Sequence, residues 1–274
     1  MTEAERKQII ALVQREVVPA IGCTEPIAVA LCVAKATETL GAKPEKIDVL
    51  LSANILKNAM GVGIPGTGMI GLPIAIALGA LIGKSEYQLE VLKDSNPAAV
   101  EEGKRFIGEK RIDISLKKNI TEKLYIEVCC KSGGNKATAI IAGGHTTFIY
   151  IARNGDVLLN KQSAGCGEEE AQVAGLTLRK VYDFAMNAPL DEIRFILETA
   201  RLNKAAAERS FDGNYGHGLG RMLRGNYEHK ILGDSVFSHI LSYTSGACDA
   251  RMAGAMIPVM SNSGSGNQGI SATL

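Results

Sequence analysis

The sequence LYIEVCCKSGGNKATAIIAGGHTTFIYIAR, residues 124–153, decides the fold class of this chain. It contains three runs rich in Val, Ile, Thr, Tyr and Phe, and glycine-containing turns separate them. Such runs are typical of β-strands, and short glycine turns between them are typical of β-hairpins. Similar runs at 111–118 and 156–162 flank this stretch. The pattern therefore predicts an antiparallel meander of about five strands that begins near Arg111.

Helical patterns lie on both sides of this β-rich segment. Apolar residues at helical spacing predict a helix in residues 3–19. A second helix is predicted between Thr24, a good N-cap, and Gly41, a good stop signal. We therefore predict an α+β fold with helices at both ends around a middle antiparallel sheet. The predicted parts are a helical N-terminal part, a β-rich segment and a second helical part, at residues 1–110, 111–167 and 168–274.

The composition argues against several classes of partner. Lys and Arg number 30 against 29 Asp and Glu, so no strong net charge draws the protein to nucleic acid or to a membrane. The N-terminus lacks the uninterrupted apolar stretch of a secretory signal, which predicts a cytoplasmic protein. The longest apolar run, residues 69–83, is too short to span a bilayer and predicts a buried helix. A small neutral or zwitterionic ligand suits this composition best.

Cys23 is the cysteine most strongly marked for chemistry. It precedes the predicted N-cap of the second helix, where the helix dipole and free backbone N–H groups favour a thiolate. Cys129 and Cys130 are consecutive in a predicted strand and so point to opposite faces, which prevents both from binding one metal ion. The spacing of the six cysteines along the chain matches neither a CxxC motif nor a zinc finger. Cys166 and Cys248 therefore receive no assigned role.

Two glycine-rich stretches carry small polar groups. The first, ANILKNAMGVGIPGTGMIG at 53–71, places Lys57 between Asn54 and Asn58, a set suited to binding a carboxylate. The second, SGSGNQG at 263–269, looks like the loop that opens a helix in pyridoxal-phosphate enzymes, with Lys57 as the Schiff-base lysine. In those enzymes the lysine and the loop are close in sequence, whereas here a whole sheet separates them. A pyridoxal-phosphate enzyme is therefore an alternative interpretation.

Four motifs, in the same order along the chain, resemble the L-cysteine desulfidase family, which is related to the alpha chain of iron-sulfur L-serine dehydratases. They are IGCTEP (21–26), ANILKNAMGVGIPGTG (53–68), SGACDARMAGAM (245–256) and SNSGSGNQGI (261–270). The resemblance implies a serine-dehydratase-alpha-like fold, a 4Fe-4S cluster held by three cysteines, and elimination of L-cysteine to sulfide, ammonia and pyruvate. It also implies that Cys23 is one cluster ligand. The other two ligands are expected beyond Leu274, so we expect this chain to be an incomplete and inactive fragment of a lyase.

The implied elimination needs a base for the Cα proton, a Lewis acid at the leaving sulfur and anchors for the substrate carboxylate. Two candidate catalytic residues are Lys57 and Glu25, although Glu25 also suits the positive end of the helix that it opens. The expected binding residues for the amino-acid substrate are Asn54, Asn58, Ser265, Gly266, Asn267 and Gln268. In this interpretation the two glycine-rich stretches enclose one substrate molecule.

The sequence leaves several alternatives open. L-Cysteine and L-serine both fit as substrates, the general base is not identified, and a homodimer is as compatible with the sequence as a monomer. A pyridoxal-phosphate β-eliminase that uses Lys57 is a further alternative. The last is a non-enzymatic module that binds a small molecule without turnover.

Overall fold

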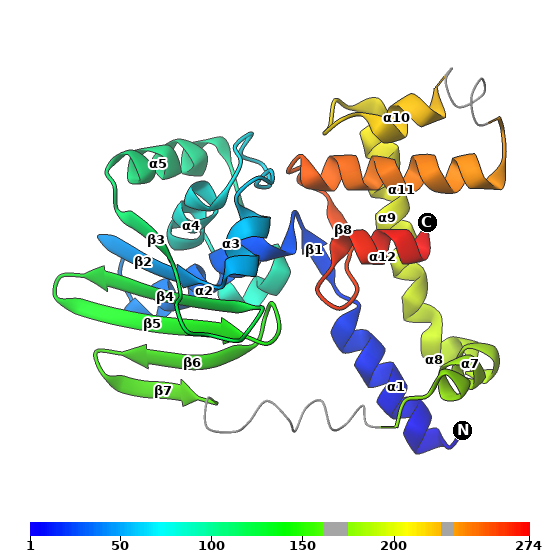
Figure 1. The fold of residues 1–274 in the computed structure, drawn as a ribbon, viewed down its shortest axis with the longest axis horizontal. Helices are drawn as coiled ribbons and strands as arrows, with labels where there is room; N and C mark the ends of the chain where they lie inside the picture. The colour runs from blue at the N-terminus through cyan, green and yellow to red at the C-terminus, as the bar shows by residue number, and fades with distance from the viewer. Residues whose placement is uncertain (162–174, 226–232) are drawn as a thin grey trace.

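The computed structural model describes residues 1–161, 175–225 and 233–274. Figure 1 shows two lobes with a small sheet between them. The first lobe contains α2 (Thr24–Leu40), β2 (Lys46–Leu51), α3 (Ala53–Ala59), α4 (Leu72–Leu81), the short 3-10 helix η1 (Ser85–Glu90), α5 (Pro97–Gly108), β3 (Ile112–Leu116), β4 (Tyr125–Ser132), β5 (Asn135–Ala142), β6 (Phe148–Arg153) and β7 (Asp156–Asn160).

The second lobe is helical. It contains α1 (Glu3–Glu16), α7 (Leu178–Asn187), α8 (Leu190–Ile193), the 3-10 helix η2 (Arg194–Ile196), α9 (Leu197–Asp212), α10 (Leu219–Arg224), α11 (Val236–Met252) and α12 (Gly266–Thr273). The small sheet pairs β1 (Pro19–Ile21) with β8 (Pro258–Met260). The α+β fold with helices around a mostly antiparallel sheet is therefore confirmed. The predicted boundary between residues 167 and 168 lies outside the described residues.

The six-stranded sheet has the order β3-β2-β4-β5-β6-β7. Strands β4 to β7 form the predicted meander, but the prediction that β3 continues it was wrong. β3 pairs in parallel with β2, and β2 pairs antiparallel with β4. Parallel neighbours need a long crossover connection, and the chain from α3 to α5 supplies it. A strand from the N-terminal part of the chain therefore lies inside the sheet.

One face of this sheet forms the main core. Side chains alternate along a strand, so Ile126, Val128 and Cys130 of β4 all point to this face and are completely buried. They pack beneath α2, which crosses β4 and β5. Cys129 lies on the opposite face and is half-buried, so the prediction for the two adjacent cysteines is confirmed.

Helix α2 is the central helix of the first lobe. Its N-cap is Cys23, one residue before the predicted position, and it ends where Gly41 adopts a left-handed conformation with φ 74°. The apolar run at 69–83 forms α4, which packs against α2 and is buried along most of its length, as predicted. Among the described residues, no helix combines the length and the apolar composition that a bilayer crossing requires.

The first glycine-rich stretch differs from the predicted loop. Lys57 lies on the short helix α3, and the glycines follow it. The N–H of Gly63 donates to the carbonyl of Met252 at 3.0 Å, and the N–H of Gly66 donates to that of Gly254 at 3.1 Å. A Cβ atom at Gly63 would collide with the backbone that follows α11. These glycines therefore allow two backbones to pack closely where the lobes meet.

Asn203 on α9 organises the core of the second lobe. Its side chain is completely buried and accepts a hydrogen bond from the N–H of Met260 at 2.8 Å. It also donates to the carbonyl of Gly269 at 3.2 Å and to the hydroxyl of Thr273 at 2.7 Å. One side chain thus ties α9 to β8 and to α12.

The sheet of β1 and β8 brings together two segments that are far apart in the sequence. Pro19 lies opposite Met260 and Ile21 opposite Pro258. Beyond the paired strands, the N–H of Ser261 donates to the carbonyl of Val18 at 2.9 Å, and its hydroxyl donates to the same oxygen at 2.7 Å. This pairing places the start of α2 beside the second glycine-rich stretch.

Candidate functional site

A cavity of about 310 Å³ lies where the two lobes meet. The first lobe contributes the start of α2, the end of α3 and the loop between β5 and β6. The second lobe contributes the end of α11 and the loop that precedes α12. The lining residues are Cys23, Thr24, Glu25, Asn58, His145, Arg251, Met252, Ser263, Gly264, Ser265 and Asn267.

The carboxylate of Glu25 is the hydrogen-bond acceptor at the α2 wall of this cavity. Cys23 Sγ donates to Glu25 Oε2 at 2.9 Å, and Thr24 Oγ1 donates to the same oxygen at 3.2 Å. The amide of Asn58 donates to Oε1 at 3.4 Å. Burial disfavours the ionised form, but the hydrogen bonds from Cys23, from the Glu25 backbone and from Thr24 together lower the pKa of Glu25. The cavity therefore holds a carboxylate on this wall.

The thiol of Cys23 is buried, with 6% of its surface exposed. Burial raises its pKa to about 12, and the negative charge of Glu25 adds to the increase, while the positive charge of Arg251 opposes it. The prediction that the start of the helix favours a thiolate was therefore wrong for this structure. Desolvation outweighs the helix dipole, and the Cys23 thiol keeps its proton and donates a hydrogen bond to the Glu25 carboxylate.

His145 reaches the cavity from the loop that joins β5 to β6. Its ring lies against Gly264, which has φ +74°, and a Cβ atom at that position would collide with Nδ1. Burial lowers the pKa of His145, and the nearby charge of Glu25 only partly opposes this effect. His145 is therefore a neutral imidazole near pH 7, a state that can accept a proton.

The second glycine-rich stretch forms a tight turn followed by a capped helix. Asn262 and Ser265 exchange backbone hydrogen bonds at 3.0 and 2.9 Å, and the residues between them, Ser263 and Gly264, both have positive φ. Two positive φ values are the mark of a type I′ turn. The hydroxyl of Ser265 then accepts from the N–H of Gln268 at 3.2 Å and caps α12.

Arg251 lines the cavity from the second lobe. It is the penultimate residue of α11, and its Nη1 donates to Asn267 Oδ1 at 2.8 Å and to the sulfur of Met252 at 3.5 Å. Arg251 is almost completely buried. The cavity thus brings together a thiol, a carboxylate, an imidazole and a guanidinium.

The residues expected from the sequence divide into two groups. The structure brings Cys23, Glu25, Asn58, Ser265 and Asn267 together around the cavity. The other four expected residues do not line the cavity: Asn54, Lys57, Gly266 and Gln268. Of these, the two on α3 are exposed, Gly266 is buried against the guanidinium of the cavity wall, and Gln268 is exposed.

His145 and Arg251 are the two cavity residues with strong chemistry that were not among the expected site residues. A signal for each exists in the sequence. His145 follows two consecutive glycines, and Arg251 lies within the motif SGACDARMAGAM. Neither of these sequence features indicates that the side chain points into the cavity.

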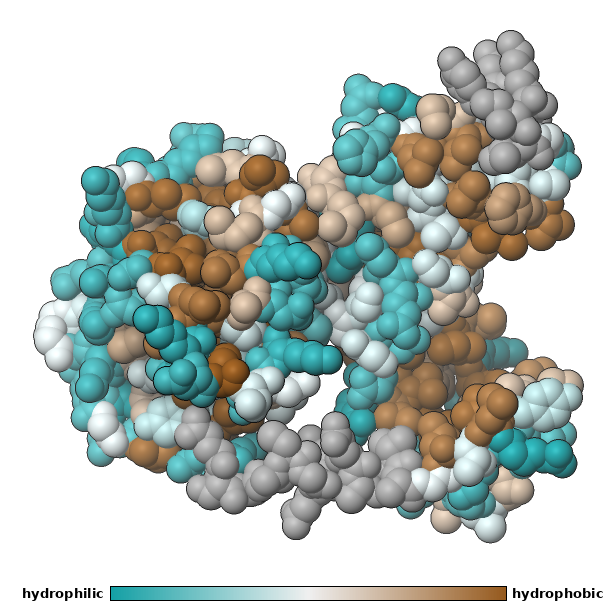
Figure 2. Space-filling view, viewed as in Figure 1, coloured by the Kyte–Doolittle hydropathy of each residue, from teal (hydrophilic) through white to brown (hydrophobic). Residues whose placement is uncertain are grey.

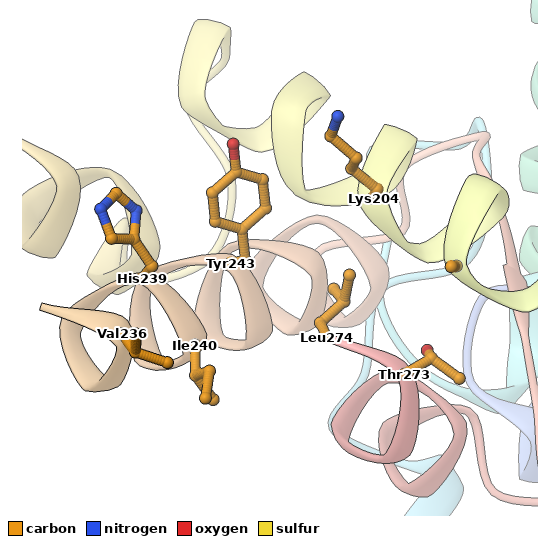
Figure 3. Close-up of a pocket in the computed structure, with 8 residues that line it drawn as sticks. Lys204, Val236, His239, Ile240, Tyr243, Thr273 and Leu274 are labelled. Carbon is orange, nitrogen blue, oxygen red and sulfur yellow. The ribbon is translucent and has the colours of Figure 1, made fainter.

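A second cavity, of about 370 Å³, lies on the helical lobe. Its lining residues include Val236, Ile240 and Tyr243 on α11, Lys204 on α9 and Leu274 after α12, which Figure 3 labels. No cysteine or carboxylate side chain lines it among the described residues. It belongs to the apolar surface of this lobe, which is brown in Figure 2. It therefore offers less chemistry than the cavity between the lobes.

The profile of the serine dehydratase alpha chain family matches residues 86–274, which include His145, Arg251 and the loop before α12. The chain belongs to the serine dehydratase alpha chain family. The family is one of lyase-type enzymes, and its members use iron-sulfur clusters in general.

Several relatives of this chain carry the name UPF0597 protein. One from Bacteroides fragilis is 82% identical over 274 residues, which cover 100% of this chain and 64% of that relative. One from Bacteroides thetaiotaomicron is 78% identical, with the same coverage of both chains. One from Chromobacterium violaceum is 46% identical over 268 residues, which cover 97% of this chain and 62% of that relative. The chain thus spans less than two thirds of their length. No solved structure matches it.

The donor set of the cavity does not by itself fit a 4Fe-4S cluster. Such clusters are held mainly by cysteine thiolates. Cys23 is the only cysteine that lines the cavity within the described part of the chain. Across residues 1–161, 175–225 and 233–274, no group of three or more His, Cys, Asp or Glu side chains is placed to hold a metal ion. Cys166 lies outside the described residues.

Proposed function

We propose that this chain carries the substrate cavity of an iron-sulfur-dependent amino-acid lyase that converts L-cysteine and one water molecule to sulfide, ammonia and pyruvate. One observation carries the proposal: Cys23, which the sequence resemblance implies as a cluster ligand, lines the same cavity as Arg251 and Asn267. Membership of a lyase family supports it. In the proposal Cys23 is one cluster ligand, and the other ligands come from outside the described residues.

The residues around the cavity suit an elimination from a small amino acid. The reaction begins with loss of the Cα proton, which needs an unprotonated acceptor near the substrate. His145, held neutral by burial, and the side chain of Glu25 both line the cavity. These two residues are therefore the proposed candidates for the base, and the catalytic role expected for Lys57 remains a prediction.

L-Serine is the second candidate substrate, because the matching family is named for serine dehydratase. L-Serine and L-cysteine differ only in the leaving atom at Cβ. The charged and polar groups of the cavity bind parts that the two amino acids share. Comparison of turnover on both substrates therefore decides between them.

The test uses protein expressed from its complete reading frame and purified without oxygen. The measurements are iron content, visible absorbance, and release of sulfide and pyruvate from L-cysteine or of pyruvate from L-serine. We expect Cys23→Ser to lose the bound iron and both activities. The matched control is Cys129→Ser, which changes a half-buried thiol on the outer face of the sheet and should keep both.

The same measurements separate the other interpretations. A pyridoxal-phosphate enzyme would be yellow without iron, and Lys57→Ala would remove its absorbance. A non-enzymatic binding module would bind an amino acid without releasing product. If Cys23→Ser keeps wild-type iron content and sulfide release, the proposed function is wrong.

A further inference from the structure

Arg251 is a buried cation without a counter-ion in the described part of the chain. Only 4% of its surface is exposed. Its Nη1 group donates to two neutral acceptors, the amide oxygen of Asn267 and the sulfur of Met252. Its Nε atom is buried without a hydrogen-bond partner, and Arg251 forms no ion pair with any described carboxylate. Burying a charge is costly unless an opposite charge accompanies it, so this buried guanidinium favours an anionic partner.

A second positive group lies on the same wall. Helix α12 begins at Gly266, and a helix start carries a partial positive charge and unpaired N–H groups. The N–H groups of Gly266 and Asn267 have no acceptor among the described residues. The Arg251 guanidinium packs so closely against Gly266 that a Cβ atom there would collide with Nε. Two independent features therefore direct positive charge to one side of the cavity.

We propose that Arg251, Asn267 and the first turn of α12 form the binding subsite for a carboxylate, which is the α-carboxylate of the substrate. Identification of the carboxylate as that of an amino acid rests on the proposed function. Guanidinium groups bind carboxylates through two parallel hydrogen bonds, which fixes the orientation of the ligand as well as its charge. The substrate class is then a small free amino acid, and an amide or a peptide bond at the same position is rejected.

The subsite also orients the ligand within the cavity. Arg251 and Asn267 lie on the wall of the second lobe, whereas Cys23 and Glu25 lie on the wall of the first lobe. A carboxylate held at Arg251 leaves the rest of a small amino acid extending toward Cys23. Lys57, the cation that the sequence suggested, is exposed on α3 and does not line this cavity.

The test measures binding of L-alanine by calorimetry to protein expressed from its complete reading frame. L-Alanine has the α-carboxylate but no leaving group, so its binding does not depend on turnover. L-Alaninamide lacks the carboxylate and should bind at least about tenfold more weakly, the loss expected for a charge-assisted contact. Arg251→Gln should weaken L-alanine binding by a similar factor.

A second variant avoids the risk that loss of a buried arginine unfolds the lobe. Asn267→Asp places a carboxylate 2.8 Å from Arg251 Nη1 and so fills the subsite from within. It should weaken L-alanine binding at least about tenfold while the melting temperature stays constant or rises. The matched control is Asn214→Asp, because Arg221 Nη1 donates to Asn214 Oδ1 at 2.6 Å at an exposed position outside the cavity. This control should bind L-alanine as the wild type does.

The outcomes separate this inference from the proposed function. Wild-type affinity in Asn267→Asp overturns the inference, and so does equal affinity of the wild type for L-alanine and L-alaninamide. An absence of L-alanine binding in the wild type also overturns it. If L-alanine binding depends on Arg251 but neither L-cysteine nor L-serine is turned over, the subsite is correct and the proposed function is wrong. If turnover occurs with a KM that does not change in Asn267→Asp, the function is correct and the subsite is wrong.

Discussion

Arg251 Nη1 donates a hydrogen bond to Asn267 Oδ1 at 2.8 Å, and this contact joins the end of α11 to the start of α12. The two residues belong to separate motifs of the sequence, and a strand and a tight turn lie between them. Gly266 makes the contact close, because its missing side chain leaves room for the guanidinium. The position of the buried Arg251 guanidinium therefore depends on the absence of a side chain at Gly266.

Gly266→Ala tests this dependence. The new methyl group would collide with Nε and Cζ of Arg251, so the guanidinium must move away from the cavity wall. We expect a loss of about 1–3 kcal/mol in the free energy of unfolding, the usual cost of overpacking, together with weaker L-alanine binding. Gly108→Ala is the control, since a Cβ atom at this helical glycine meets nothing within 4 Å. Equal stability of the two variants would show that the guanidinium is not confined.

Asn203→Ala should destabilise the second lobe. The variant removes the acceptor for Met260 N–H and the donors to the Gly269 carbonyl and the Thr273 hydroxyl, all in a buried position. Unsatisfied buried polar groups make this costly, and we expect a decrease of about 2–4 kcal/mol in the free energy of unfolding in urea. Asn187→Ala, at an exposed asparagine on α7, should change it by less than about 0.5 kcal/mol. A small effect at Asn203 would contradict its role in tying α9 to β8 and α12.

His145 should make the stability of the protein depend on pH. Its pKa is lowered in the folded state because burial disfavours the imidazolium, so the unfolded chain binds a proton more readily. The stabilising contribution is therefore complete above the ordinary pKa of 6.5 and is lost as the pH falls through the lowered value. Urea unfolding at pH 7.5 and 5.5 measures this loss, which should be smaller in His145→Asn. An equal loss in both proteins would assign the pH dependence to other groups.

The Cys23 thiol should react slowly in metal-free protein. Burial raises its pKa to about 12, so almost no thiolate is present at pH 8. We expect iodoacetamide to modify half-buried Cys129 before Cys23, with peptide mass spectrometry following each site. Unfolding in urea should bring the two rates within a few-fold of each other. Rapid modification of Cys23 in the folded protein would mean that its thiolate is stabilised after all.

Local patterns in the sequence predicted most of the elements of the fold. The alternation of apolar residues marked β4 and β5, and their buried positions follow it. Gly41 marked the end of α2 because a left-handed residue at that point favours glycine. The apolar run that forms α4 was recognised as buried. Each of these features depends on neighbouring residues alone, which is why the sequence was sufficient.

Features that depend on distant residues were not predicted. β3 has the local pattern of a strand, but its partner β2 is chosen by the crossover of α3 to α5 and not by its neighbours. Lys57 lies on α3, a helix too short to be marked by periodicity.

Arg251 was missed for a related reason. A charged residue on a helix is usually exposed, so only the tertiary fold shows that this one is buried at the cavity. Five of the nine expected site residues nevertheless line the cavity, because the motifs that contain them converge there.

The pairing of β1 with β8 has a consequence for synthesis of the protein. The hydroxyl of Ser261 reaches the carbonyl of Val18, a partner 243 positions earlier in the chain. At the usual rate of translation, the nascent N-terminal edge waits about 12–50 s on the ribosome for that partner to emerge. Throughout that interval the Cys23 end of α2 has neither β8 nor the turn before α12 to cover it. The wall of the cavity that carries the Cys23 thiol is therefore synthesised well before the wall that carries the Arg251 guanidinium.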